Sequence, residues 1–213
     1  MKIVLEKEQK IFFTSDTHYS HENICSSTSK WVDGDNYTRK FTSLEEMNDT
    51  LVNNINEVVG ENDILIHLGD WSFGGFEKIR EFWDRLICKN IHLILGNHDH
   101  HIERDRDGVQ GLFKSVSHYN TIEVDGKKIR VMHYPISSWD GLSKGYIHFH
   151  GHCHLPTHLR FGLGRRMDVG MDGHPDFRPY NLVREAIPMM LNRPIKSEIG
   201  FDHHTDELKG VVG

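Results

Sequence analysis

The stretch Ile91-His92-Leu93-Ile94-Leu95-Gly96-Asn97-His98-Asp99 starts as a short apolar run and ends on polar side chains that can bind a metal ion. Such a run predicts a buried β-strand, and the loop after a strand is where an α/β sheet places its reactive groups. Four other apolar runs end on similar residues: Ile11–Ser15 before Asp16-Thr17-His18, Ile64–Leu68 before Gly69-Asp70, Ile129–Met132 before His133, and Tyr146–His150 before Gly151-His152-Cys153-His154. We therefore expect five strand ends to meet in one crevice.

Seven candidate metal ligands follow these runs: Asp16, His18, Asp70, Asn97, His133, His152 and His154. Their carboxylate, amide and imidazole groups suit Mn, Fe, Zn or Ni better than Mg or Ca. Asp16 and His18 are separated by one residue, and in an extended segment this spacing turns both side chains to the same side. The same spacing joins His152 to His154 and predicts that Cys153 points away from the metal ions.

The 213-residue chain is long enough for one domain with a sizeable core, and we expect that domain over residues 1–195 and a flexible tail over 196–213. Its formal net charge of −6 argues against general nucleic-acid affinity and stable duplex binding, which need a basic face. The three cysteines are odd in number and widely spaced, so they do not form a disulfide framework. No run reaches the length of a transmembrane helix, and Met1–Glu6 is too short an apolar stretch for a signal peptide. We expect a cytoplasmic protein without membrane contacts.

Local signals predict two helices in the first half of the chain. Ser43-Leu44-Glu45-Glu46 is a capping box with apolar residues at helical spacing behind it, so we expect a helix over Leu44–Val59 that ends at Gly60. Phe76–Cys88 predicts a second helix with one apolar face. Helices and strands therefore alternate between residues 44 and 95, which favours parallel strand pairing through right-handed crossovers.

The second half of the chain is richer in strands. Asn120–Val124 and Lys127–Met132 flank Asp125-Gly126, which is a strong two-residue hairpin signal. Residues 181–191 indicate a helix that Pro188 should end early. The fold class that we predict is α/β, with two mixed β-sheets packed face to face and helices outside them.

The ligand motifs also form an ordered series. They are Asp16-x-His18, Gly69-Asp70, Gly96-Asn97-His98-Asp99, His133 and Gly151-His152-x-His154. This series resembles the signature of the calcineurin-like metallophosphoesterases, and the resemblance covers about residues 10 to 190. Within that superfamily the chain looks most similar to short, single-domain phosphoesterases of bacteria and their phages. His21-Glu22-Asn23 and Tyr134-Pro135-Ile136 support this narrower resemblance.

The resemblance implies two divalent metal ions that share Asp70. The first ion would bind Asp16, His18, Asp70 and His154, and the second would bind Asp70, Asn97, His133 and His152. Such pairs lie about 3.5–4 Å apart and share a bridging hydroxide that attacks phosphorus. We expect Mn²⁺ first, with Fe, Zn or Ni as alternatives. His98 would stabilise or protonate the departing oxygen, and Asp99 would hold the His98 imidazole in the correct tautomer.

Four further residues are candidate substrate contacts: His21, Asn23, Arg104 and Trp139. His21 and Asn23 could contact the substrate or a metal-bound water, or they could bond only to the loop backbone. Arg104 lies in the polar stretch His100–Gly111, which could bind a phosphate or nucleotide or be a plain solvated loop. Trp139 could stack on a nucleobase or anchor its own loop. The histidines inside the apolar runs are expected to be satisfied buried side chains: His67, His92, His148 and His150.

The second motif departs from the pattern Gly-Asp-x-x-Asp-Arg that many members of the family share. The chain reads Gly69-Asp70-Trp71-Ser72-Phe73-Gly74, so the second acidic residue and the arginine are missing. Neither missing residue is a metal ligand. We therefore expect metal binding to survive and a substrate contact to differ.

The function that the resemblance implies is hydrolysis of phosphodiester bonds in small, nucleotide-derived substrates by a binuclear-metal phosphoesterase. The alternatives are a phosphomonoesterase or protein phosphatase, and a metal-binding scaffold without catalysis. Such a scaffold would be expected to lack His98 or several ligands, whereas all eight of these positions are filled. A purely structural zinc site fits poorly, because such sites favour cysteine ligands.

Overall fold

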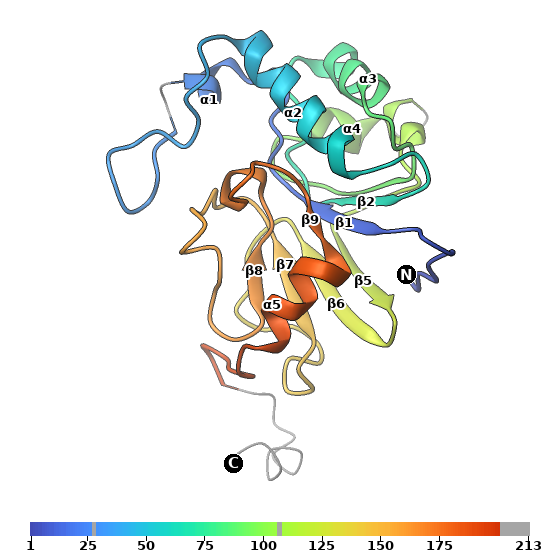
Figure 1. The fold of residues 1–213 in the computed structure, drawn as a ribbon, viewed down its shortest axis with the longest axis vertical. Coiled ribbons are helices and arrows are strands. Elements are labelled where there is room, and N and C mark those ends of the chain that lie inside the picture. Colours follow the sequence, from blue (N-terminus) through green and yellow to red (C-terminus); the bar gives the residue numbers. More distant parts are fainter. Residues whose placement is uncertain (27–28, 106–107, 201–213) are drawn as a thin grey trace.

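The computed structural model describes residues 1–26, 29–105 and 108–200, which form two β-sheets with helices around them (Figure 1). The strands are β1 Ile11–Thr14, β2 Ile64–His67, β3 Ile91–Ile94, β4 Ser115–Ser117, β5 Tyr119–Val124, β6 Lys127–Met132, β7 Ile147–His150, β8 Arg166–Asp168 and β9 Tyr180–Asn181. The first sheet has the order β4-β3-β2-β1-β9 and is parallel except for β9. The second has the order β5-β6-β7-β8, with β5 antiparallel to β6 and the other pairs parallel. The predicted fold class, with two mixed sheets, is confirmed.

The helical elements lie mainly in the first half of the chain. They are α1 Glu22–Ser26, α2 Leu44–Val58, α3 Gly75–Arg85, α4 His100–Arg104 and α5 Ile187–Leu191, with 3₁₀ turns at Val109–Leu112 and Met171–Gly173 and a π-helical turn at Leu182–Ala186. The predicted capping box starts α2: the Ser43 hydroxyl accepts the N–H of Glu46 at 3.1 Å. The Glu46 carboxylate in turn accepts the N–H of Thr42 at 2.6 Å. None of the helices in the described ranges is long and apolar enough to cross a bilayer.

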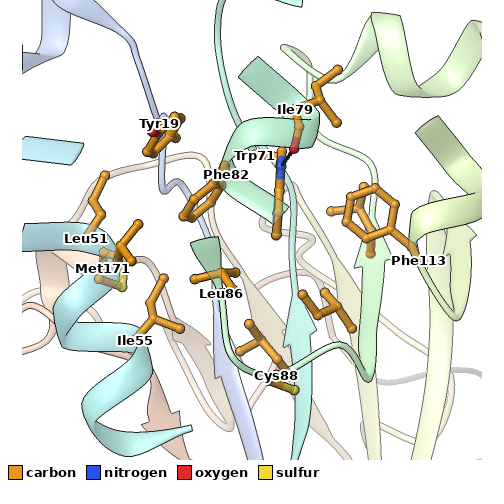
Figure 2. Close-up of a cluster of buried hydrophobic side chains, with 14 of the residues drawn as sticks. Tyr19, Leu51, Ile55, Trp71, Ile79, Phe82, Leu86, Cys88, Phe113 and Met171 are labelled. Atoms are coloured by element: carbon orange, nitrogen blue, oxygen red, sulfur yellow. Dashed lines mark hydrogen bonds between the residues drawn. The ribbon is translucent and has the colours of Figure 1, made fainter. Parts of the chain in front are cut away.

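Strands β1 and β2 are buried on both faces, which explains why they read as unbroken apolar runs. Phe12 and Leu65 face a cluster formed with α2 and α3. Part of this cluster is drawn in Figure 2, with Leu51, Ile55, Trp71, Ile79, Phe82 and Leu86 among its members. Phe13 and Ile66 point the other way, into a second cluster shared with the second sheet. There the Phe13 ring meets the Phe149 ring edge-on at 5.1 Å, so the two sheets share one apolar interface.

The second predicted helix is shorter than expected, since α3 ends at Arg85 and not at Cys88. Leu86 already has extended backbone angles, and its N–H donates to the carbonyl of Trp83 in a closing turn. Leu86 and Cys88 are buried in the core beneath the sheet. The helix therefore ends early, and the extended segment that follows buries these two apolar side chains before β3 begins.

The expectation that Pro188 ends the last helix is wrong. The N–H of Ile187 donates to the carbonyl of Leu182, five residues back, which makes a wide π-helical turn. Pro188 consequently falls in the first turn of α5, where a proline needs no N–H donor. The helical segment thus continues through Pro188 to Leu191.

The predicted hairpin joins β5 to β6 in antiparallel register, and Asp125 and Gly126 both have positive φ, as its two-residue turn requires. Of the predicted tail, residues 196–200 are described, and the remainder lies outside the described residues. Within residues 196–200, the Glu198 carboxylate accepts a hydrogen bond from Arg166 at 2.7 Å.

Candidate metal centre

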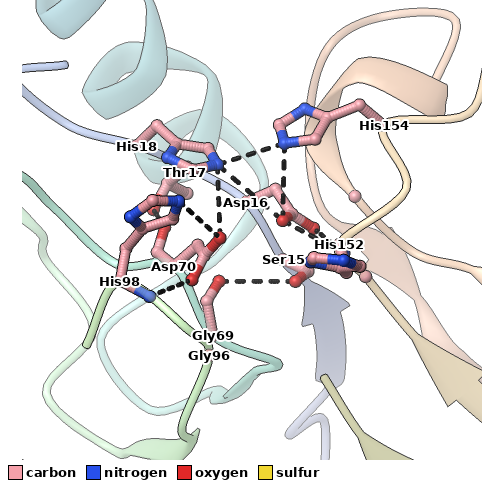
Figure 3. A network of polar contacts seen from close by, with 12 residues as sticks. Ser15, Asp16, Thr17, His18, Gly69, Asp70, Gly96, His98, His152 and His154 are labelled. Atoms are coloured by element: carbon pink, nitrogen blue, oxygen red, sulfur yellow. Dashed lines mark hydrogen bonds and ion pairs between the residues drawn. The ribbon is translucent and has the colours of Figure 1, made fainter. Parts of the chain in front are cut away.

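The seven ligand candidates follow β1, β2 and β3 of the first sheet and β6 and β7 of the second. Figure 3 labels five of them: Asp16, His18, Asp70, His152 and His154. Backbone hydrogen bonds tie these strand-end loops together. The N–H of Asp16 donates to the carbonyl of Gly69 at 2.9 Å, and the N–H of Gly151 donates to the carbonyl of His133 at 2.9 Å. The two sheets are then linked directly, because the N–H of His152 donates to the Asp16 carboxylate at 2.9 Å.

The first group of ligand atoms comes from Asp16, His18 and His154, and these atoms lie within 4.8 Å of one another. The Nε2 atoms of His18 and His154 face each other at 3.1 Å. An Asp16 carboxylate oxygen lies 3.6 Å from the His154 nitrogen and 3.8 Å from the His18 nitrogen. All three ligand atoms therefore converge on one small volume.

The second group comes from Asp70, His133 and His152, again within 4.8 Å of one another. Asn97 joins this group, since its Oδ1 lies 3.0 Å from His133 Nε2 and 2.9 Å from His152 Nδ1. His133 is oriented through its other nitrogen, Nδ1, which lies 2.7 Å from the carbonyl of Leu68. A backbone carbonyl at that nitrogen leaves Nε2 available for a metal ion.

Asp70 lies between the two groups. Its Oδ2 is 3.5 Å from the Nε2 of His18 in the first group and 3.5 Å from the Nε2 of His133 in the second. Its Oδ1 accepts the backbone N–H of His98 at 2.9 Å, which fixes the carboxylate plane. One carboxylate can therefore serve both ligand groups.

The charges of the site favour bound cations. Asp16 and Asp70 are buried, and burial, together with the charge of Asp16, raises the pKa of Asp70. Burial lowers the pKa of His18 well below its usual value, and His154 and Arg39 add to this, so that the His18 imidazole is neutral. Buried carboxylates beside imidazole nitrogens fit divalent transition metals, which accept both donor types.

Five of the seven ligand candidates have left-handed backbone angles. The φ values are 57° at Asp16, 48° at His18, 57° at Asp70, 70° at His152 and 47° at His154. The prediction that the Asp-x-His and His-x-His segments are extended is therefore wrong, although their side chains do converge. Left-handed residues on either side of a buried Thr17 bring Asp16 and His18 together while the threonine hydroxyl bonds to His67 and to the backbone. Cys153 belongs to neither ligand group of the described residues.

Two glycines allow the strand-end loops to approach this closely. Gly69 has a φ of +100°, and a Cβ there would lie 2.5 Å from the backbone nitrogen of Gly96. A Cβ on Gly96 would lie 2.2 Å from an Asp70 carboxylate oxygen. Space therefore requires a glycine at both positions, and at Gly69 the backbone angle requires it as well.

Asp99 has a different role from the one predicted. Its buried carboxylate accepts the N–H of Asp70 at 2.8 Å, of Trp71 at 2.9 Å and of Gly96 at 2.8 Å. Burial raises its pKa to about 6 in spite of these bonds. Because the carboxylate is occupied by the backbone of two loops, Asp99 organises the metal loops and does not orient the His98 imidazole.

His98 lies at the rim of the site (Figure 3), and 41% of its side chain is exposed. Its Nε2 is 4.0 Å from Asp70 Oδ2, and its ring lies 4.7 Å from the ring of Phe73 and 5.5 Å from that of His18. The imidazole of His98 is therefore partly open to solvent beside the Asp70 carboxylate.

Arg39 and Asp172 are parts of the site that the sequence reasoning missed. The buried Asp172 carboxylate lies 2.7 Å from His154 Nδ1 and accepts the Arg39 guanidinium at 2.9 and 3.1 Å. Arg39 also donates to the carbonyls of Thr17 and Asp16 at 2.9 and 2.6 Å. Burial lowers the pKa of His154, but Asp16 and Asp172 outweigh this and raise it to about 9. A metal ion at His154 must therefore displace a proton.

The four candidate substrate residues lie in different surroundings. His21 is close to the centre: its ring stacks on Phe73 at 3.5 Å and lies 5.3 Å from the His18 ring. Asn23 is exposed on α1, and Arg104 is exposed at the end of α4. Trp139 is buried, and its indole N–H donates to the carbonyl of Tyr146 at 2.9 Å, as expected for a residue that anchors its own loop.

The histidines inside the apolar runs are satisfied by hydrogen bonds, as predicted. His67 bonds to Thr17 at 2.9 Å, His92 bonds to Ser115 at 2.8 Å, and His150 Nδ1 lies 2.9 Å from the carbonyl of Gly151. Burial lowers the pKa of His67 and of His150 to about 3. They support the strands and belong to neither ligand group of the described residues.

The ordered ligands and the two mixed sheets agree with a comparison against known families. A family model described as calcineurin-like phosphoesterase matches residues 9–185. The chain belongs to this family. The calcineurin-like phosphoesterases are hydrolases, and the ligand groups described above give this member two possible metal sites.

Individual relatives extend from archaea to phages. The chain is 35% identical over 153 residues to an uncharacterized protein of Methanocaldococcus jannaschii, which covers 71% of this chain and 72% of the relative. It is 29% identical over 189 residues to the gene 66 protein of Mycobacterium phage L5, with 76% and 86% covered. A solved protein of unknown function from Aquifex aeolicus shares the fold, with a TM-score of 0.58, 24% identity, and 82% of this chain and 96% of that chain covered.

Proposed function

We propose that this calcineurin-like phosphoesterase hydrolyses phosphodiester bonds of small, nucleotide-type substrates with two divalent metal ions. The observation that carries the proposal is the position of Asp70, whose Oδ2 lies 3.5 Å from a histidine of each ligand group. A carboxylate between two groups supports a pair of ions that share a ligand. We propose Mn²⁺ as the first metal to test, because the ligand set mixes oxygen and nitrogen donors.

The bound ions would supply Lewis-acid polarisation of the phosphoryl oxygens and activation of the attacking water. The first ion would be held by Asp16, His18, Asp70 and His154, and the second by Asp70, Asn97, His133 and His152. Two divalent charges exceed the two carboxylate charges, so an anionic phosphate would be attracted to the site although the chain is acidic overall.

His98 is the residue that we assign to the leaving group. Its imidazole is exposed beside Asp70, and its backbone N–H is held by the same carboxylate. From the rim it can donate a proton to the departing oxygen, which matters most when that oxygen is a poor leaving group.

The residues around His98 favour a diester over a monoester. Phe73 and Gly74 stand where many family members have Asp-Arg. The chain therefore has an apolar ring beside His98 and lacks the arginine cation that those members carry at the next position. A diester carries one negative charge less than a fully ionised monoester and depends less on such a cation. A phosphomonoesterase or protein phosphatase is the second candidate.

The test is hydrolysis of bis(p-nitrophenyl) phosphate and of p-nitrophenyl phosphate by metal-stripped protein that is reloaded with Mn²⁺. We expect metal-dependent turnover of the diester that falls at least about 100-fold in His98→Ala. Faster turnover of the monoester would favour the second candidate. A loaded protein that cleaves neither ester with Mn²⁺, Zn²⁺, Ni²⁺ or Fe²⁺ would contradict the proposal.

A further inference from the structure

The orientation of the His98 imidazole must come from a residue other than Asp99. The Asp99 carboxylate is occupied by three backbone N–H groups, and 41% of the His98 side chain is exposed. A half-exposed histidine can adopt several rotamers, and only some of them direct Nε2 toward a substrate. A catalytic role for His98 therefore needs a neighbour that restricts its side chain.

Phe73 is in the right place to restrict it. Its ring centre lies 4.7 Å from that of His98, with an angle of 43° between the planes. Phe73 also stacks on His21, whose ring lies parallel to it at 3.5 Å and 6°, and its ring centre lies 5.6 Å from that of His18. The centre of the His21 ring is in turn 6.2 Å from that of His98, so the stacked pair Phe73 and His21 lies along one side of the His98 imidazole.

Backbone hydrogen bonds in two of the ligand loops fix the positions of Phe73 and His21. The N–H of Phe73 donates to the carbonyl of Tyr19 at 2.8 Å, and the N–H of His21 donates to the carbonyl of His18 at 3.0 Å. Gly74 then turns the chain into α3 with a φ of +96°. A Cβ at Gly74 would lie 2.6 Å from the Cγ of Lys78, so the arginine of the common family pattern does not fit this turn without a shift.

We propose that Phe73, supported by His21, is the positioning residue for His98. The Phe73 ring occupies the space into which the imidazole would otherwise rotate, and it keeps Nε2 on the side of Asp70. This inference rests on the proposed function, since it assigns His98 to the leaving group. Phe73 itself does not touch the reacting atoms and acts only through His98.

The kinetic test compares Phe73→Ala with wild type on methyl aryl phosphodiesters whose phenol leaving groups range from 4-nitrophenol to phenol. We expect kcat to fall about 10-fold with 4-nitrophenol and about 100-fold with phenol, with little change in KM, because a misplaced proton donor matters more for a poor leaving group. Phe73→Tyr keeps the ring and should stay close to wild type. Phe76→Ala is the matched control, since Phe76 is exposed on α3 and contacts His101 instead.

A double-mutant comparison separates positioning from general stability. If Phe73 acts through His98, the double variant Phe73→Ala/His98→Ala should be no slower than His98→Ala alone. Multiplicative losses, or an equal loss with every leaving group, would overturn the inference. If the wild-type protein hydrolyses none of these phosphodiesters, that result would instead contradict the proposed function.

A spectroscopic readout tests the contact without catalysis. In Zn²⁺-loaded protein, the ring protons of His98 should show a ring-current shift from Phe73, with the signal assigned by its absence in His98→Gln. We expect Phe73→Ala to remove this shift and Phe76→Ala to preserve it. A His98 signal that is the same in Phe73→Ala as in wild type would overturn the inference, whatever the activity.

Discussion

Replacing Asp99 with alanine tests the role that the structure gives to this carboxylate. The change removes the acceptor of the N–H groups of Asp70, Trp71 and Gly96, which are bonded at 2.8, 2.9 and 2.8 Å. Three buried donors without acceptors cost about 6 kcal/mol together. Burial raises the pKa of Asp99 from 3.8 to about 6, so removing the charge recovers about 3 kcal/mol at pH 7. We expect the free energy of unfolding to fall by about 3 kcal/mol.

The same substitution should weaken metal binding. The N–H of Asp70 and the loop that begins at Gly96 lose their common anchor, so the shared ligand and Asn97 become less well positioned. Loss of such a supporting contact typically weakens metal affinity about 10- to 100-fold. Urea unfolding of the metal-free protein measures stability, and titration calorimetry with Mn²⁺ measures affinity.

Asp63→Ala is the matched control for this experiment. Asp63 is also buried and accepts two backbone N–H groups, from Lys10 at 2.8 Å and from Gly60 at 2.9 Å, but it lies at the opposite end of β2. It should lose stability and keep its Mn²⁺ affinity. The reasoning would be refuted if Asp99→Ala kept both stability and affinity and lost activity as His98→Ala does, because Asp99 would then act on the imidazole.

Three further changes test other parts of the molecule. Arg39→Met should lower stability by about 3–5 kcal/mol in urea unfolding, because it leaves the buried charge of Asp172 without its arginine. It should also weaken Mn²⁺ binding about 10-fold in calorimetry, since Asp172 bonds to His154. An unchanged Mn²⁺ affinity would contradict the link between this ion pair and the metal site. Gly69→Ala should cost more than about 2 kcal/mol in thermal unfolding, since φ is +100° and a Cβ would lie 2.5 Å from the nitrogen of Gly96; a near-neutral change would show that the loops can separate. Lowering the pH from 7 to 5 should destabilise the fold by about 2 kcal/mol through His150 alone, because its pKa is about 3 when folded and 6.5 when unfolded. The stability that its neutral form contributes is complete above pH 6.5 and is lost as the pH falls toward 3, and His150→Asn should therefore show a shallower pH dependence in urea unfolding.

Features encoded by neighbouring residues were predictable. The capping box located the start of α2 at Leu44, and Asp125-Gly126 located the turn between β5 and β6. The apolar runs marked the strands before each ligand, because a strand buried on both faces cannot carry exposed polar residues. These signals lie within a few residues of the structure they specify, so they do not depend on contacts with distant parts of the chain.

Features made by distant residues were not predictable. Arg39 and Asp172 are 133 positions apart, and neither belongs to a motif that marks it in the sequence. Asp99 was assigned to its neighbour His98, whereas its partners Asp70 and Trp71 are 29 and 28 positions away. A buried carboxylate is occupied by the donors that the fold brings to it, and adjacency in the sequence does not select them.

The left-handed backbone at the ligands connects these two kinds of feature. Each such residue other than glycine costs about 1 kcal/mol or more, so five of them are retained only where other interactions compensate. The compensation is visible as hydrogen bonds between loops: Asp16 N–H to Gly69, His18 N–H to Asp70 and His152 N–H to the Asp16 carboxylate. Because each loop holds the next in its strained form, no single Asp-x-His or His-x-His motif could show its own geometry. The motifs specify the ligands, and the contacts among the loops set the angles at which the ligands meet.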